Sequence, residues 1–361
     1  MSGLKQILKL VVEQGATLAR DEARQLLAAI LASEPGDGDL EIASLLTAMA
    51  TRGETADELT GFAEAMRSLV VPLPLTEEER ASLVDTCGTG GDGLGTFNIS
   101  TGAALVAVAA GAKVAKHGNR AVTSRCGSAD VLEALGVPVT LAPARAVECL
   151  RANGFMFLLA PSLHPAMKRV MPIRRALGFR TIFNLAGPLT NPAGAQAQVM
   201  GVYSAEKLPV VAEAMARLGV RHAFVAHGSD GLDEITVSGE TQLAEVRTAR
   251  NEGQGKGIGV QRSANTVRLF HLAPEDVGMG RASLKALAGG ETAAENAAIL
   301  ERIFAGEPGP RRDIVLLNAA AALVAAGVAS GFANGIERGA AAIDRGAAWS
   351  VVERLRDFAK R

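Results

Sequence analysis

Aromatic residues are scarce in this sequence: one Trp and one Tyr occur among 361 residues, and aromatics make up 4% of the chain. Proteins that bind single-stranded nucleic acid stack bases on aromatic side chains, so the composition argues against that role. An excess of positive charge is also missing, because 37 Lys and Arg residues are balanced by 38 Asp and Glu residues. Without a general basic field we expect no binding of DNA or another large polyanion, although a small anion can still bind locally.

Cysteine is also rare. Cys87, Cys126 and Cys149 form no CxxC pair and are odd in number, which argues for free thiols in a reducing compartment and against a zinc site. We therefore expect a cytoplasmic protein. No apolar run approaches the roughly 20 residues of a membrane-spanning helix, and the amphipathic stretch MSGLKQILKLVVEQG is typical of a first helix rather than of a signal peptide. The length suggests two or three domains.

The sequence pattern changes along the chain. Residues 1–72 have the apolar spacing of helices, and the prolines of VPLPLT then indicate a linker. From residue 73 onward, short apolar runs such as SLVDT, KVAKHGN, GFMFLLAP and RHAFVAHG alternate with helical stretches. This alternation predicts an α/β domain with a central, mainly parallel sheet. A segment broken by prolines, at about 165–190, is expected to leave the sheet.

A glycine-rich stretch, DTCGTGGDGLGTFNISTG (residues 85–102), places five glycines within eleven residues. Three of them fit the dinucleotide pattern GxGxxG after a predicted strand. That pattern requires an acidic residue at the end of the next strand to bind a ribose, whereas the next strand here ends in Lys116 and His117. The Gly-Lys-Ser/Thr of a P-loop is absent too. Both nucleotide motifs are therefore rejected.

The remaining interpretation of this stretch is an anion site. The glycine turn leads into a helix whose first residues include Asn98, Ser100 and Thr101. Exposed backbone N–H groups, hydroxyls and the positive end of a helix together favour phosphate. A tight strand-to-helix turn would explain one or two glycines but not five, so we favour the functional interpretation.

A second cluster, KHGNRAVTSRCGSAD (116–130), follows another predicted strand. Taken alone, each residue has an ordinary explanation: Lys116 as a surface charge, His117 as a core imidazole, Asn119 as a turn residue, and Ser124 or Ser128 as a helix cap. Ligands of open α/β sheets bind where strands end. The clustering at a strand end therefore favours a binding site.

A third cluster, HGSDGLDEITVSG (227–239), gathers Asp230, Asp233 and Glu234 around a glycine turn. Carboxylates this close repel one another unless a divalent cation lies between them, and Mg²⁺ that bridges to substrate phosphates needs only a few carboxylates. Taken alone, the motif is better explained as an exposed acidic turn. Beside two loops that favour phosphate, the metal interpretation gains weight.

Together these blocks resemble the signature motifs of the anthranilate phosphoribosyltransferase family, as do LHPAMKRVMPIRRALGFRTIFNLAGPLTNPAG and RGETADELTGFAEAMR. The resemblance extends from about residue 18 to the end. It implies the nucleoside phosphorylase/phosphoribosyltransferase-like fold, with a small helical domain (1–72, joined in space by about 165–190) and a large α/β phosphoribosyl-binding domain (73–164 and 191–361). It also implies a homodimer formed through the small domains.

The activity that the resemblance implies is transfer of the 5-phosphoribosyl group of phosphoribosyl pyrophosphate (PRPP) to the amine of anthranilate. The products are N-(5-phosphoribosyl)anthranilate and pyrophosphate, in the second step from chorismate to tryptophan. Mg²⁺ is the expected cofactor. An aniline nitrogen becomes very acidic once alkylated, so a strong base is hardly needed, and His117 is at most a proton acceptor.

The resemblance also implies a set of site residues. PRPP contacts are expected from Gly88, Gly91, Asp92, Thr96, Asn98, Ile99, Ser100, Thr101, Lys116, His117, Gly118, Asn119, Arg120, Ser124 and Ser128. Anthranilate contacts are expected from Gly88, Asn119, His164 and Arg174, catalytic roles for Arg174, His117 and Asn119, and Mg²⁺ ligands from Ser100, Asp233 and Glu234. A planar Arg174 guanidinium suits a benzoate carboxylate, although without the family a charge on a helix surface explains it equally well.

Two alternatives belong to the same fold. A pyrimidine nucleoside phosphorylase would use phosphate and no metal, and the Asp233–Glu234 pair and Arg174 argue against it. A non-catalytic relative that binds nucleic acid would have lost the PRPP loop and would carry a basic face. The intact loop and the balanced charge make that second alternative weak.

Overall fold

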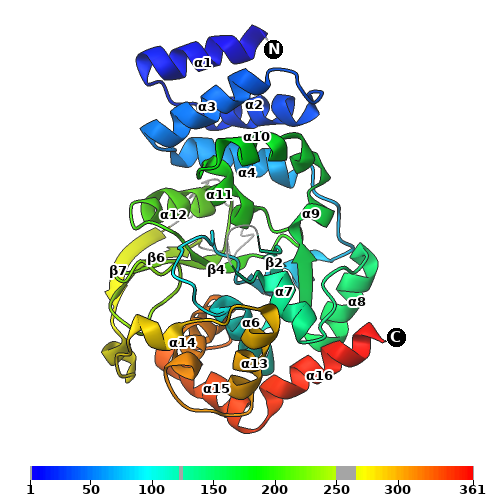
Figure 1. Ribbon diagram of the computed structural model, residues 1–361, viewed down its shortest axis with the longest axis vertical. Coiled ribbons are helices and arrows are strands. Elements are labelled where there is room, and N and C mark those ends of the chain that lie inside the picture. Colours follow the sequence, from blue (N-terminus) through cyan, green and yellow to red (C-terminus); the bar gives the residue numbers. More distant parts are fainter. Residues whose placement is uncertain (1, 122–124, 249–265, 361) are drawn as a thin grey trace, which may run out of the picture.

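The computed structural model describes residues 2–121, 125–248 and 266–360 of the chain. It has a narrow helical part at one end and a broader α/β part at the other, with the N-terminus at the tip of the helical part (Figure 1). The helical part begins with α1 (Ser2–Gln14), α2 (Arg20–Ala32), α3 (Asp39–Arg52) and α4 (Ala56–Arg67). The helices predicted before the VPLPLT linker are therefore confirmed.

Each helix of this part has one apolar face. In α2, residues Ala23, Leu26, Leu27, Ile30 and Leu31 recur at the spacing of a helix, and all five are buried. This face packs mainly against α4. The sequence periodicity alone predicts which side of α2 is buried.

A buried carboxylate fastens the helical part together. Glu58, in the first turn of α4, has no exposed surface. It accepts hydrogen bonds from the backbone N–H of Leu18 and of Thr55, both at 3.0 Å, and from the Arg52 guanidinium at 2.6 Å. Glu58 thus connects the start of α4 to the end of α3 and to the α1–α2 connection.

We expect Glu58→Ala to lower the free energy of unfolding by about 3 kcal/mol, because two backbone N–H groups and a guanidinium lose their acceptor. Thermal unfolding of the unligated protein measures the change. Glu13→Ala, at an exposed position of α1, is the matched control and should shift the midpoint little. Equal shifts for the two variants would contradict the role given to Glu58.

The segment broken by prolines leaves the sheet, as predicted, and covers the helical part. It contains η1 (Pro165–Arg169), α10 (Met171–Leu177), α11 (Ile182–Ala186) and η2 (Gly187–Thr190), which pack against α2, α3 and α4 (Figure 1). Arg169 anchors it through hydrogen bonds to Ser33 Oγ at 3.0 Å and the Asp37 carbonyl at 2.7 Å. Segments distant in sequence therefore share one helical layer.

The described residues form one seven-stranded sheet in the order β3-β2-β1-β4-β5-β6-β7. The strands are β1 (Leu83–Asp85), β2 (Lys113–Gly118), β3 (Phe155–Leu159), β4 (Ala197–Gly201), β5 (His222–Gly228), β6 (Thr241–Arg247) and β7 (Thr266–Leu272). The first five run parallel, and β6 and β7 are antiparallel. The predicted mainly parallel sheet is confirmed.

Helices cover both faces of the sheet, which explains why the parallel strands are mostly buried and mainly apolar. Alternate residues of a strand enter different cores: Val84 and Val114 lie on one side, and Leu83 and Ala115 on the other. The remaining helices are α5 (Glu77–Ser82), α6 (Ile99–Ala109), α7 (Ser128–Ala134), α8 (Pro143–Asn153), α9 (Ala160–Leu163), α12 (Lys207–Arg217), η3 (Pro274–Val277), η4 (Leu284–Leu287), α13 (Ala293–Phe304), α14 (Pro310–Ala325), α15 (Phe332–Asp344) and α16 (Ala347–Ala359).

Small residues allow the central helices to pack closely. A Cβ added at Gly335 of α15 would lie 2.7 Å from the Ala320 Cβ of α14, and one at Gly102 of α6 would lie 2.8 Å from a Leu300 methyl group. Both distances are shorter than van der Waals contact.

In the described ranges, no helix combines the length and the apolarity that crossing a bilayer requires.

Candidate functional site

The strand order determines where the three predicted clusters meet. The chain builds β1, β2 and β3 in one direction and then returns to place β4 on the other side of β1. Parallel sheets of this kind bind ligands beside the carboxyl ends of the strands at such a reversal. The glycine-rich loop follows β1, the KHGN segment ends β2, and Asp233 and Glu234 follow β5. All three clusters therefore lie at one edge of the sheet.

Glycine contacts bring these loops together. A Cβ at Gly88 would lie 3.0 Å from the Gly201 carbonyl oxygen, and a Cβ at Gly201 would lie 1.5 Å from the carbonyl oxygen of Asp233. The backbone N–H of Thr89 donates to the Gly201 oxygen at 2.9 Å. The loops after β1, β4 and β5 can approach this closely only because side chains are missing.

The glycine-rich loop also needs glycine for its backbone conformation. Gly90, Gly91, Gly93 and Gly95 have φ angles of +63°, +78°, +77° and +66°, a left-handed region that other residues seldom adopt. The number of glycines therefore has a conformational reason beside the anion site that the sequence suggested. Predicted contacts Gly88, Gly91, Asp92 and Thr96 all lie in this loop.

The loop leads into the N-terminus of α6, where Asn98, Ile99, Ser100 and Thr101 lie. The Asn98 side chain does not cap the helix but donates to the Cys126 carbonyl at 3.1 Å. Asn98 Oδ1 and Thr101 Oγ1 are buried and find no hydrogen-bond partner among the described residues. Unpaired buried polar atoms beside a helix N-terminus suit a phosphate ligand.

Lys116 lies in β2 with only 2% of its surface exposed. Its Nζ donates to the Thr86 carbonyl at 3.0 Å, Thr86 Oγ1 at 2.9 Å and Ser100 Oγ at 3.3 Å. Burial lowers the pKa of this ammonium, opposed by the charges of Cys87, Asp85 and Glu234. Lys116 ties the end of β1 to the first turn of α6 and contributes positive charge beneath the glycine loop.

Two carboxylates after β5, those of Asp233 and Glu234, are half-buried. Burial, together with the charges of Asp92 and Glu234, raises the pKa of Asp233 well above its usual value. Burial raises the pKa of Glu234 to about 7, although Lys116 opposes the shift. Glu234 Oε1 accepts the backbone N–H of Ser100 at 3.2 Å. The predicted Mg²⁺ ligands Ser100, Asp233 and Glu234 thus lie close together.

This donor set fits a divalent cation. Asp92, Asp233 and Glu234 supply hard carboxylate oxygens, and Ser100 supplies a hydroxyl, which are the oxygen ligands that Mg²⁺ prefers. Burial, helped by repulsion between neighbouring carboxylates, raises the pKa values of Asp233 and Glu234, and a cation would relieve that repulsion.

A pair of histidines lies on the other side of Lys116. The rings of His117 and His164 are 5.1 Å apart, and both ring nitrogens of His117 and Nε2 of His164 lack hydrogen-bond partners within the described ranges. Burial lowers the pKa of His117 to about 3, helped by the charges of His164 and Lys116, and burial lowers that of His164 to about 4. Both imidazoles are therefore neutral near pH 7 and can accept a proton or a hydrogen bond.

Asp85 holds the strand ends beneath these histidines. Its oxygens accept the His117 backbone N–H at 3.1 Å and Asn191 Nδ2 at 2.7 Å. The ligand atoms of Asp85, Cys87 and His117 lie within 4.8 Å of one another, a grouping that the cysteine spacing did not suggest. Because both Asp85 oxygens are already bonded and burial raises the pKa of the Cys87 thiol, we assign this group a structural role.

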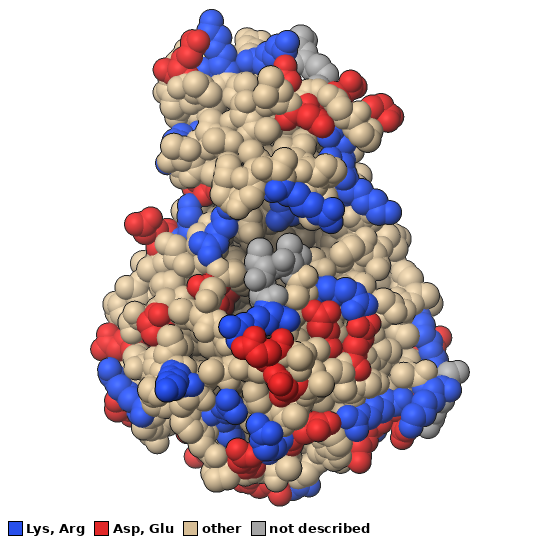
Figure 2. All heavy atoms as spheres, viewed as in Figure 1, with Lys and Arg blue, Asp and Glu red and all other residues tan. Residues whose placement is uncertain are grey.

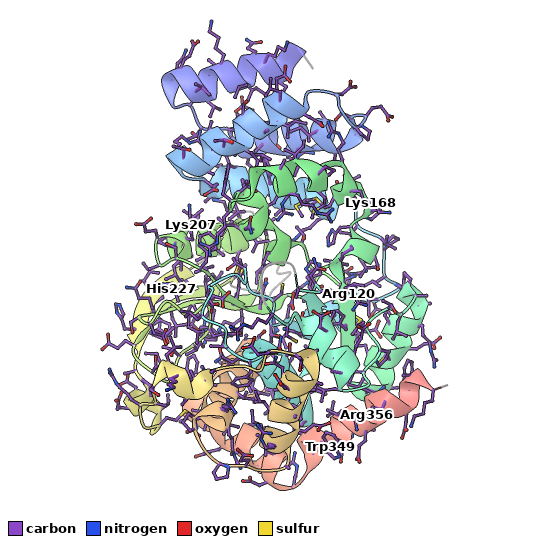
Figure 3. All side chains as sticks on the ribbon, viewed as in Figure 1. Arg120, Lys168, Lys207, His227, Trp349 and Arg356 are labelled. Atoms are coloured by element: carbon purple, nitrogen blue, oxygen red, sulfur yellow. The ribbon has the colours of Figure 1, made fainter. Side chains whose placement is uncertain are left out.

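The segment after β2 turns tightly around Gly118. A Cβ there would lie 2.4 Å from Ser128 Oγ. Asn119 uses its Oδ1 to accept the backbone N–H of Arg120 at 2.8 Å, and Arg120 forms an ion pair with Glu133 at 2.7 Å. Figure 3 shows Arg120 in the α/β part, close to the junction with the helical part. Another predicted PRPP contact, Ser124, lies outside the described residues.

Arg174 lies on α10, in the layer that covers the helical part. Its guanidinium lies over the Phe183 ring at 5.3 Å, and among the described residues no carboxylate forms an ion pair with it. Burial lowers its pKa. Figure 2 shows a hollow between the helical and α/β parts with Lys and Arg side chains along its helical margin. An anionic ligand entering there would meet positive charge.

Several residues that hold the site together were missed by sequence reasoning. Asn318 of α14 pairs with the Ile235 backbone through bonds of 3.0 and 2.8 Å, directly after Glu234. Asn191 and Gly201 act from other segments, as described above. Only Asn191 carried a recognisable sequence signal, because it lies in the TNPAG motif. Asn318, a single Asn in an alanine-rich helix, and Gly201, the last residue of a strand, have no such signal.

Comparisons with known proteins agree with this architecture. The family model described as "Glycosyl transferase family, helical bundle domain" matches residues 5–70, and "Glycosyl transferase family, a/b domain" matches residues 80–349. The chain is 49% identical over 359 residues to an anthranilate phosphoribosyltransferase of Solibacter usitatus, covering 99% of each chain.

Solved structures give the same relationship. The chain superposes on the anthranilate phosphoribosyltransferase of Thermus thermophilus with a TM-score of 0.86 and 43% identity, covering 100% of both chains. It superposes on the Saccharomyces cerevisiae enzyme in complex with PRPP and Mg with a TM-score of 0.83 and 29% identity, covering 99% of this chain and 98% of that one.

Proposed function

The chain belongs to the anthranilate phosphoribosyltransferase family, and from this membership we infer that the loops after β1, β2 and β5 form its PRPP and Mg²⁺ site. The enzyme transfers the 5-phosphoribosyl group of PRPP to the amine of anthranilate, giving N-(5-phosphoribosyl)anthranilate and pyrophosphate in tryptophan biosynthesis. The observation that carries the site assignment is the meeting of two half-buried carboxylates with a glycine-rich loop and a helix N-terminus.

We assign PRPP to the glycine-rich loop, the first turn of α6 and the segment after β2. The supporting observations are the unpaired oxygens of Asn98 and Thr101 and the buried ammonium of Lys116. Ser100, Asp233 and Glu234 would hold Mg²⁺. When bound, Mg²⁺ supplies Lewis-acid stabilisation of the negative charge that develops on pyrophosphate.

The protein's own groups act by charge and position. Positive charge builds on C1 of the ribose and negative charge on the leaving pyrophosphate as the amine approaches. Backbone N–H groups of the loop, the N-terminus of α6 and Lys116 are placed to stabilise the leaving group. Holding both substrates in line removes most of the entropic cost of their encounter. We expect no covalent intermediate with the enzyme.

We assign the anthranilate site to the space between the loops that follow β1, β2 and β5 and the helical part. Arg174 would bind the anthranilate carboxylate, Gly88 and Asn119 would contact the ring from the α/β part, and His164 would line the path. The absence of an ion-pair partner for Arg174 within the described ranges supports this assignment. We assign His117 as the group that accepts the amine proton, because its imidazole is neutral and has no hydrogen-bond partner among the described residues.

His117→Ala should lower kcat by roughly tenfold, less than a full general base contributes. Since its pKa is about 3, the wild-type rate should show no change attributable to His117 between pH 5 and 8. The kcat–pH profile of both enzymes measures this, with the exposed His271→Ala as control. Full turnover with an unchanged profile would end the proton-acceptor hypothesis.

We also propose the domain division of the family. Residues 1–72, joined by about 165–190, form the small helical domain, and 73–164 with 191–361 form the large domain. The packing of η1, α10 and α11 on α2, α3 and α4 supports this division.

We propose that two copies associate through the small domains. The apolar side chains of Leu10, Val12 and Leu40 in these domains are 40%, 62% and 78% exposed, and an interface would cover them.

Three free cysteines support a cytoplasmic location.

The reaction itself is tested by the loss of anthranilate fluorescence on adding PRPP and Mg²⁺, repeated with EDTA. Pyrophosphate release is followed in parallel, with and without anthranilate. Consumption of both substrates that depends on metal is the expected result. If PRPP binds while anthranilate is untouched, the acceptor assignment with Arg174 fails. Phosphorolysis of a pyrimidine nucleoside would favour the nucleoside phosphorylase alternative instead.

A further inference from the structure

Arg180 connects the acceptor segment to the glycine-rich loop. It lies in the turn between α10 and α11, six residues after Arg174. One guanidinium nitrogen, Nη2, donates to the carbonyl oxygen of Gly91, and the guanidinium lies over the Tyr203 ring at 4.4 Å. Tyr203 follows β4, so one side chain contacts a strand end of the α/β part and the tip of the PRPP loop together.

The tip of this loop is held from two sides. Asp233 accepts the backbone N–H of Gly90 and interacts with the side chain of Asp92. The second contact is the hydrogen bond that Arg180 Nη2 donates to the Gly91 carbonyl. The base of the loop is fastened separately, by the bonds from Thr89 to Gly201 and from Gly289 to Gly95, both at 2.9 Å. Movement of Arg180 therefore changes the tip while leaving the base in place.

We propose that Arg180 is a positioning residue that couples the two substrate sites, a proposal that rests on the function assigned above. An anthranilate carboxylate on Arg174 fixes the α10–α11 turn, and Arg180 then holds Gly91 and Asp92 in the conformation that binds the pyrophosphate group. Coupling of this kind is reciprocal, so a bound pyrophosphate group strengthens anthranilate binding by the same factor.

Arginine is suited to this task and lysine is not. A planar guanidinium can donate to a carbonyl in its plane while its face stacks on an aromatic ring. A lysine ammonium at the same position can make one of these contacts well but not both. Arg180→Lys should therefore restore only part of the coupling, whereas Arg180→Met should remove it.

The test measures the Kd of anthranilate from its fluorescence, alone and with saturating magnesium pyrophosphate, which cannot react. In the wild type we expect pyrophosphate to tighten anthranilate binding by about tenfold. The ratio of the anthranilate Kd without pyrophosphate to the Kd with pyrophosphate measures the coupling. In Arg180→Met this ratio should fall to about one, with little change in the Kd measured without pyrophosphate. Arg175→Met, an exposed neighbour on α10, should keep the wild-type ratio. Equal melting temperatures for the three proteins would exclude a merely structural role.

The outcomes separate this proposal from the proposed function. A wild-type ratio in Arg180→Met overturns the coupling, and so does a ratio of one in the wild type. Weaker pyrophosphate binding with the ratio unchanged also overturns it, because Arg180 would then contact the anion directly. Failure of the wild type to bind anthranilate at all would contradict the proposed function instead.

Discussion

Replacing Asp233 and Glu234 together by alanine should lower kcat by at least about a thousandfold, because we assign these two carboxylates as ligands of Mg²⁺. Steady-state turnover over a range of Mg²⁺ concentrations measures the loss. Glu240→Gln changes an exposed carboxylate of the same loop region and serves as control. Undiminished dependence on Mg²⁺ in the double variant would refute the ligand assignment.

Removing the charges of the same pair should raise the stability of the metal-free protein, although it lowers activity. The pKa of Glu234 in the folded, metal-free protein is about 7, above its usual 4.5. This group therefore contributes most stability below pH 4.5, and the contribution is lost as the pH rises towards 7, by about 3 kcal/mol for a shift of this size. Substitution by the neutral isosteres, Asp233→Asn with Glu234→Gln, removes that loss.

The measurement is the melting temperature of metal-free protein at pH 5 and pH 7. The amide double variant should melt at a higher temperature than the wild type at pH 7, with a smaller difference at pH 5. Mg²⁺ should stabilise the wild type and leave the variant unaffected, since binding to the folded state alone raises stability. Equal stabilisation of both by Mg²⁺ would mean that the metal is held elsewhere.

Arg174→Ala should raise the KM for anthranilate by roughly a hundredfold, which is the usual cost of removing a half-buried cation from a charge-assisted pair. The KM for PRPP should rise by no more than about tenfold, the factor expected from loss of the coupling, because Arg174 lies on α10 and not on the loops that follow the strands. Arg174→Lys should recover only part of the loss, since an ammonium cannot bind a carboxylate with two parallel bonds.

Steady-state kinetics with each substrate varied in turn separates these effects. Arg175→Ala is the natural control, because it removes an equal charge from the next position of the same helix. An unchanged anthranilate KM in Arg174→Ala would place the acceptor carboxylate elsewhere. A rise in the KM for PRPP well beyond about tenfold would show that α10 contributes directly to the phosphate site.

Much of this architecture could be predicted from the sequence. The face of α2 that packs on α4 follows from apolar spacing, and the mainly parallel sheet follows from strands alternating with helices. The loop after β1 was recognisable because left-handed turns and close contacts both demand glycine, as Gly91 shows. These features depend on residues close together in the chain.

Features that depend on distant residues could not be predicted. The position of β4 beside β1 brings Gly201 between Gly88 and Asp233, and nothing near Gly201 in the sequence indicates that neighbour. The pairing of Asn318 with the Ile235 backbone is equally hidden, because the two residues meet only after the sheet and α14 have packed. The half-buried position of Arg174 over the Phe183 ring, without an ion-pair partner within the described ranges, is likewise a property of the folded protein.

The placement of α10 between β3 and β4 has a consequence for redesign. Arg174 lies in a single insertion, whereas the residues assigned to PRPP and Mg²⁺ lie on turns that follow other strands. A designer who keeps Arg180 could exchange the rest of that insertion and change which nucleophile receives the ribose, while the machinery that activates the donor stays as it is. The same separation would allow natural selection to alter acceptor preference in small steps without first giving up the leaving-group chemistry.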